Sequence, residues 1–117
     1  MSIVEQFEAQ SSETPYTPHK VFAGVYMKHL VTGAQTDGRF SSHLIKVDPN
    51  GVLDTHVHAT QIEVHQVLAG SGDCTLDDKS RLYVPGSVAV IPQNVPHKIV
   101  AGPEGIYLLA QFTPALL

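Results

Sequence analysis

The sequence predicts an all-β protein that folds as an antiparallel sandwich or barrel. Short runs rich in β-branched and aromatic residues alternate with clusters of Gly, Pro, Asn and Asp along most of the chain, a pattern typical of many short strands. No segment is predicted to be helical. Most of the eight prolines stand at the ends of predicted strands, where a missing N–H leaves the ladder intact. An antiparallel jelly roll is the simplest fold with these properties.

The chain has 117 residues, which suits one domain with its own core and is too short for two domains of ordinary size. Residues 1–18 are polar, contain Pro15 and Pro18, and lack a sustained apolar period. We therefore expect an extended N-terminal arm over residues 1–18 and a β-barrel domain over residues 19–117.

The first two predicted strands fall within residues 20–31 and 39–48, on either side of the turn-rich stretch 32–38. Seven further strands are predicted at 53–58, 62–69, 73–77, 80–84, 87–92, 96–101 and 105–112. Because turn residues interrupt the apolar runs at Gly70-Ser71-Gly72 and Gly102-Pro103, strand breaks are expected there.

Alternating apolar residues within these strands predict the composition of the core. The expected core positions include Val67, Val88, Val90 and Ile99. Cys74, the single cysteine, cannot form an internal disulfide and is expected to be a small buried side chain.

Composition excludes several function classes. Seven Lys plus Arg stand against eleven Asp plus Glu, for a net charge of −4 without a basic cluster, so no nucleic-acid partner is expected. No run of 18 or more residues is free of polar interruption, which excludes a membrane-spanning helix. The N-terminus lacks the positively charged and apolar regions of a secretory signal, so we expect a cytoplasmic location.

Three histidines and one glutamate are spaced as a metal site would require. His56 and His58 stand at positions i and i+2 of a predicted strand, where alternate side chains face the same way. Residue parity changes before Glu63, so a turn or bulge at residues 59–60 is needed to bring this carboxylate to the same face. His97 opens a later strand that a jelly roll can place beside the first.

These four side chains form a mixed nitrogen and oxygen ligand set. Such a set suits one divalent transition metal ion (Fe, Mn, Ni, Zn, Co or Cu) and leaves two adjacent positions open in an octahedral ion. Substrate or dioxygen could occupy those positions.

The chain here resembles the cupin superfamily, whose first motif is a glycine, then His-x-His, a Glu and a second glycine. That motif corresponds to Gly51, His56, His58, Glu63 and Gly70. Four residues rather than the usual five separate Gly51 from His56.

The second cupin motif corresponds to Gly86, Pro92, Asn94 and His97. The family usually has glycine at the position of Asn94, but asparagine is the other residue that best tolerates a positive φ. The resemblance covers about residues 39–112. It implies a double-stranded β-helix, a metal ion near one end of the barrel and frequent dimers.

Other polar residues could serve as a metal ligand or as proton carriers at this site. Gln61 and His65 have the same strand parity as Glu63 and could compete with it as fourth ligand, although the spacing to Gly70 favours Glu63. His65 and His43 are the candidate catalytic proton carriers, and His29 is a weaker candidate for the same role.

Two classes of function fit these features. The first is a metalloenzyme that acts on a small organic substrate as a dioxygenase, isomerase or lyase. The second is a non-catalytic barrel that binds or senses a small ligand. We favour the enzyme, and expect a homodimer whose interface uses residues 15–25, because the arm has too few apolar residues to fold back as a layer by itself.

Overall fold

The structure is a computed structural model and describes residues 14–117, so most of the predicted arm, residues 1–13, lies outside the described residues. The described part contains eight strands and one short helix. Their bounds are β1 (Thr17–Pro18), β2 (Val25–Val31), α2 (Gly33–Thr36), β3 (Ser41–Val47), β4 (Val52–His56), β5 (Ile62–Leu76), β6 (Lys79–Tyr83), β7 (Val88–Ile91) and β8 (His97–Thr113). Every pairing among them is antiparallel, and the prediction of an all-β jelly roll is confirmed.

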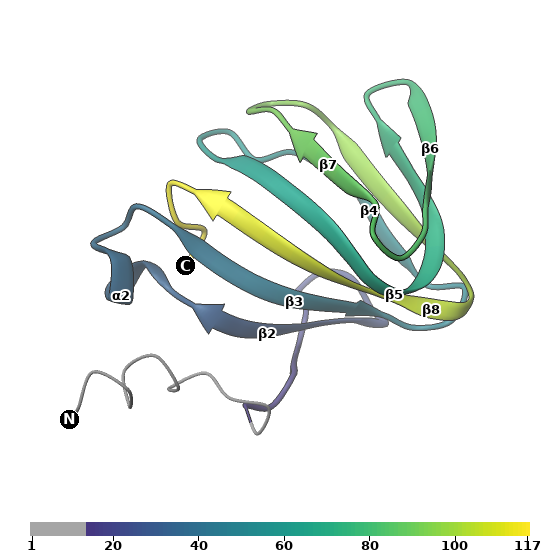
Figure 1. Cartoon of the computed structure of the whole chain (residues 1–117), viewed down its shortest axis with the longest axis horizontal. Helices are drawn as coiled ribbons and strands as arrows, with labels where there is room; N and C mark the ends of the chain where they lie inside the picture. The colour runs from purple at the N-terminus through teal and green to yellow at the C-terminus, as the bar shows by residue number, and fades with distance from the viewer. Residues whose placement is uncertain (1–13) are drawn as a thin grey trace.

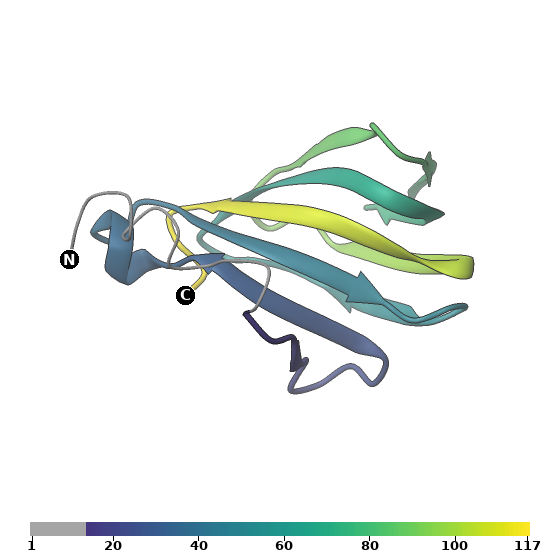
Figure 2. The same ribbon diagram turned by 60° about the horizontal axis from the view of Figure 1, so that its bottom comes forward.

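Two long strands, β5 and β8, connect the two layers of the fold. The second half of β8 and the first half of β5 lie between β3 and β7, in a layer that β2 and β1 continue. The first half of β8 and the second half of β5 lie between β4 and β6 in the other layer. Figure 1 shows β2, β3, β8 and β5 side by side, and Figure 2 shows that the sheet curls instead of lying flat.

Glycines bend these two strands where the sequence predicts breaks. The expected breaks at Gly70-Ser71-Gly72 and Gly102-Pro103 are wrong, because β5 and β8 continue through both positions. Gly70 has a φ of 75°, Gly105 has a φ of 80°, and the register shifts between Gly70 and Gly72. A Cβ on Gly70 would overlap the carbonyl oxygen of Gly105. The glycines therefore allow a corner at which each strand passes from one layer to the other.

The stretch 32–38 contains a helix that the sequence does not predict. Helix α2 is a single turn of four residues, too short to display an apolar period. The Thr32 amide donates to Oε1 of Gln35 at 3.0 Å, and Asp37 ends the helix with a φ of 58°. Local side-chain and backbone bonds thus account for the turn.

The core between the layers confirms part of the predicted set. Val67 and Ile99 are buried, as is Cys74. Val88 and Val90 are 60% and 59% exposed, so their assignment to the core is wrong. The apolar run of β7 is continuous and cannot reveal which alternate residues face inward. Pairing with β5 determines which residues of β7 face the core, and the buried ones are Ala89 and Ile91.

The end of the predicted arm and the residues that follow it fold back on the chain's own barrel. Strand β1 pairs with β2, and Phe22 packs against the hydrophobic core. Much of the segment stays exposed, including Val21 at 75%, so its burial by a second subunit remains a prediction. No helix in residues 14–117 is long and apolar enough to cross a membrane.

Candidate functional site

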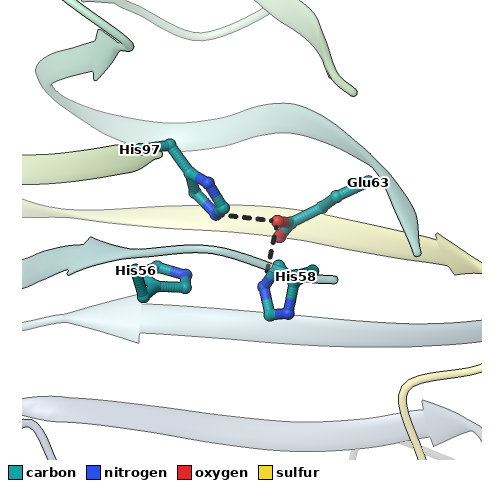
Figure 3. A group of neighbouring side chains, drawn as sticks. All are labelled: His56, His58, Glu63 and His97. Carbon is teal, nitrogen blue, oxygen red and sulfur yellow. Dashed lines mark ion pairs between the residues drawn. The ribbon is translucent and has the colours of Figure 1, made fainter. Parts of the chain in front are cut away.

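The two cupin-like motifs meet at one end of the barrel, between the layers. His56 ends β4, His97 begins β8, and the two are direct partners in the ladder. His58 follows β4, a bend at residues 59–60 reverses the chain as expected, and Glu63 is the second residue of β5. One nitrogen or oxygen from each of these four side chains lies within 4.8 Å of the others. Figure 3 shows the four side chains converging.

Backbone carbonyls fix the tautomers of two of the imidazoles. Nδ1 of His56 donates to the carbonyl of Asp54 at 2.7 Å, and Nδ1 of His97 donates to that of Val95 at 3.0 Å. A carbonyl can only accept, so the proton of each neutral ring is on Nδ1. The lone pairs on Nε2 are therefore left for another partner. Burial is the main reason that the pKa of His56 falls to about 4, which keeps that ring neutral.

Glu63 lies at the centre of the cluster and is almost completely buried. Its Oε1 is 3.0 Å from Nε2 of His97 and 3.5 Å from Nε2 of His58, contacts drawn as dashed lines in Figure 3. Burial by itself would raise the pKa of Glu63, but interactions with His65 and His97 outweigh it and hold the pKa well below its usual range. The carboxylate is therefore ionised.

Two atoms of this cluster are buried without a hydrogen-bond partner in the described chain. They are Oε1 of Glu63 and Nε2 of His97, whose 3.0 Å separation is not aligned for a hydrogen bond. Buried polar groups are rarely left unpaired, and two facing lone pairs repel unless a cation lies between them. The donor set of three imidazole nitrogens and one carboxylate oxygen thus fits a divalent transition metal ion.

The His65 side chain does not point to the place where the four clustered side chains converge. Its Nε2 lies 2.7 Å from Oε2 of Glu63, the carboxylate oxygen turned away from the cluster, and its Nδ1 lies 2.9 Å from the hydroxyl of Tyr83. The ionised carboxylate accepts the Nε2 proton, so the Tyr83 hydroxyl donates to Nδ1. His65 therefore orients Glu63. The other suggested competitor, Gln61, directs its amide to the carbonyl of Ala115 at 3.4 Å.

His43 lies in a separate polar cluster. Its ring is fully buried, with Nδ1 at 2.8 Å from Nδ1 of His29 and Nε2 at 2.8 Å from Oγ of Ser41. The Phe112 ring contacts both His43 and His58, with centroids 5.5 and 5.0 Å away. Neither His43 nor His29 belongs to the group of four converging side chains, and neither lines the pocket described next.

A pocket of about 370 Å³, open to solvent, lies over the cluster. His56, His58 and Glu63 line it on the polar side. Its apolar wall consists of Val25, Met27, Ile45, Leu53, Phe112 and Leu116. An apolar wall with a few polar groups is typical of ligand sites.

Two residues near this pocket are not predicted from the sequence. His19 lines it, and Phe22 stacks on His19 with a centroid separation of 4.9 Å and lies 5.9 Å from the His56 ring. Both precede the two motifs, at the end of a polar stretch. A histidine and an aromatic residue three positions apart are the only sign of them in the sequence.

Comparisons with known proteins agree with this fold. A family model described as "Cupin domain" matches residues 43–109. No curated protein matches the chain.

Several solved structures are similar in three dimensions. KdgF from Halomonas sp. has a TM-score of 0.76 and 22% identity, over 87% of either chain. A protein described as a predicted oxalate decarboxylase from Thermotoga maritima has a TM-score of 0.81 and 22% identity, over 89% of this chain and 96% of the other. An RmlC-like cupin from Shewanella frigidimarina has a TM-score of 0.76 and 20% identity, over 91% and 88%. At these identities, the likeness shows a shared fold.

Proposed function

The chain belongs to the cupin family, and from this premise we propose that it is a metalloenzyme acting on a small organic molecule. Its ligands would be His56, His58, Glu63 and His97, holding one divalent transition metal ion per chain. When bound, the ion would supply Lewis-acid chemistry or activate dioxygen, in a dioxygenase, isomerase or lyase reaction.

The observation that carries this proposal is the pair of unpartnered buried atoms, Oε1 of Glu63 and Nε2 of His97. A structural role would favour apolar side chains here, because burying an ionised carboxylate is costly unless something compensates it. The carboxylate is instead turned by His65 so that one oxygen faces three imidazoles. The apolar wall around them would exclude water from the bound substrate.

A non-catalytic ligand-binding or sensor barrel is the second candidate. It is favoured by the absence of His65 and His43, the candidate proton carriers, from the residues that line the pocket. The likeness to a protein described as a predicted oxalate decarboxylase supports the enzyme. Turnover of a substrate would distinguish the enzyme from the non-catalytic barrel.

Elemental analysis of protein purified without chelator tests the metal proposal, followed by oxygen-uptake screening of the iron(II)-loaded form. We expect one equivalent of a first-row transition metal in the purified or reloaded protein. Failure of the purified protein to hold any of these ions on reloading would contradict the proposal. Metal binding without turnover of any substrate would favour the sensor barrel.

Metal affinity should fall as the pH decreases. Burial lowers the pKa of His97, but its contacts with Glu63 and the Val95 carbonyl outweigh burial and raise that pKa above the ordinary 6.5. Below this raised pKa the ion must displace a proton from His97. The pKa values of His56 and His58 are lowered by burial, so they do not compete above pH 6.5.

We therefore expect affinity to drop by about tenfold per pH unit below the His97 pKa, the dependence of a single released proton. Competition titrations against a chelator at pH 6, 7 and 8 would measure it. A constant affinity over this range would show that no proton is displaced.

His65→Leu should weaken metal binding by about 10- to 100-fold, the usual cost of removing a partner that orients a ligand. Without the Nε2 proton of His65, Oε2 of Glu63 would lose its 2.7 Å bond and the carboxylate could turn away. His43→Leu is the matched control, since it removes an equally buried imidazole outside the cluster. Equal losses of affinity in the two variants would attribute the effect to core damage.

The homodimer and the cytoplasmic location remain proposals. Light scattering at micromolar concentration tests the first. A mass near the 12.6 kDa of one chain would exclude a dimer, and a dimer that persists after deletion of residues 1–20 would show that the arm is not required. Cell fractionation tests the second.

A further inference from the structure

His19 is the one side chain of the described pocket lining that is neither apolar nor part of the proposed metal site. It comes from the segment between β1 and β2, outside both cupin motifs. Its ring is partly buried. A single polar side chain in an otherwise apolar wall usually sets the orientation and identity of a ligand.

The ring of His19 is held by several contacts. Nδ1 accepts hydrogen bonds from the amides of Val21 at 3.1 Å and Phe22 at 3.2 Å. The backbone amide of His19 donates to the carbonyl of Val25 at 2.8 Å. The Phe22 ring stacks on the imidazole at an interplanar angle of 26°, and Phe22 itself packs against the core. The imidazole is thereby fixed before any ligand arrives.

These contacts also determine which nitrogen carries the proton. A nitrogen whose lone pair accepts two amide protons cannot carry a proton of its own, so the neutral ring of His19 is protonated at Nε2. Among residues 14–117, the hydrogen bonds of this ring are only those at Nδ1. Nε2–H is therefore a donor whose partner must come from the pocket or from solvent.

We infer that Nε2–H of His19 recognises the far end of the substrate. The molecule would have two oxygens that chelate the metal ion, a short apolar body, and an uncharged oxygen, either hydroxyl or carbonyl, that accepts from His19. The far oxygen is uncharged because the ring is neutral and no Lys or Arg is among the residues that line the pocket. This inference rests on the proposed metal site.

Binding of 2-oxo acids to the cobalt(II)-loaded protein tests the inference, followed through the visible spectrum of the ion. The probes are straight-chain 2-oxo acids of four to six carbons and their counterparts with a terminal hydroxyl. In the wild type, the hydroxylated member should bind about three- to tenfold more tightly at the chain length that spans the pocket, the gain from one hydrogen bond. In His19→Phe, which keeps an aromatic ring against Phe22, this preference should disappear while the plain acids bind as before.

The outcomes separate this inference from the proposed function. Failure of cobalt(II) to bind would contradict the proposed function and with it this inference. Failure of every 2-oxo acid to bind the cobalt(II)-loaded protein would overturn the inference alone, because the inferred molecule chelates the ion through two oxygens. Binding without a hydroxyl preference, or with a preference that survives in His19→Phe, would overturn only the role of His19.

A second measurement needs neither metal nor ligand. Long-range proton–nitrogen correlation spectra of the metal-free wild type should show His19 as the Nε2–H tautomer. Predominance of the Nδ1–H tautomer would also overturn the inference, whether or not the variant folds.

Discussion

His58→Ala is expected to lower metal affinity by more than 100-fold while the barrel stays folded. Loss of a direct ligand should exceed the 10- to 100-fold cost of losing an orienting partner. His58 lies outside the strands, and 18% of its side chain is exposed. Its removal should therefore change the free energy of unfolding of the metal-free protein by only about 1 kcal/mol. Isothermal titration with metal and urea unfolding would measure the two effects.

Val57→Ala is the matched control for this variant. Val57 is the immediate neighbour of two proposed ligands, and its side chain is 50% exposed. The control should keep the affinity of the wild type. Affinity retained in His58→Ala would contradict its role as a ligand. Loss of cooperative unfolding in the metal-stripped wild type would instead show that the ion holds the barrel together.

Gly70→Ala is expected to cost roughly 2–5 kcal/mol of the free energy of unfolding. An alanine at a φ of 75° pays for a left-handed conformation, at about 1–2 kcal/mol. Its Cβ would also overlap the Gly105 carbonyl oxygen across the corner of the fold, and overpacking adds about 1–3 kcal/mol. The backbone on both sides belongs to long paired strands and has little freedom to move away. Urea unfolding gives the difference directly.

Gly86→Ala separates the two contributions. Gly86 also has a positive φ, of 92°, but nothing lies within 4 Å of a Cβ built there. This control should show only the conformational cost. Similar losses for the two variants would mean that the approach of Gly70 to Gly105 is not a tight contact.

The sequence predicts the cluster better than the strands around it. Two histidines at i and i+2 share a face because strand geometry requires it, and the needed reversal at residues 59–60 is present. The expectation that asparagine can replace glycine in the second motif is confirmed, because Asn94 has a φ of 66°.

Other features depend on contacts that no local pattern records. A glycine that bends a strand and a glycine that ends one look alike in sequence, so the continuity of β5 through Gly70 could not be predicted. His65 and Glu63 share strand parity, and only the packing of Tyr83 shows which of them faces the cluster. Likewise, the local sequence does not show that Val88 and Val90 face outward, because the pairing of β7 with β5 determines it.

The candidate metal site depends on the corner at Gly70, which lies far from it along β5. His97 pairs with Leu76 at the far end of β5, and Glu63 pairs with Phe112 at the far end of β8. The two proposed ligands are thus distant along the sheet and meet only because it folds over. Glu63 and Gly70 are seven residue steps apart along the strand, a lever of about 23 Å, so a hinge rotation of about 5° at Gly70 would displace the carboxylate by about 2 Å. Substitutions at the corner are therefore expected to shift the proposed metal site without changing any of its side chains.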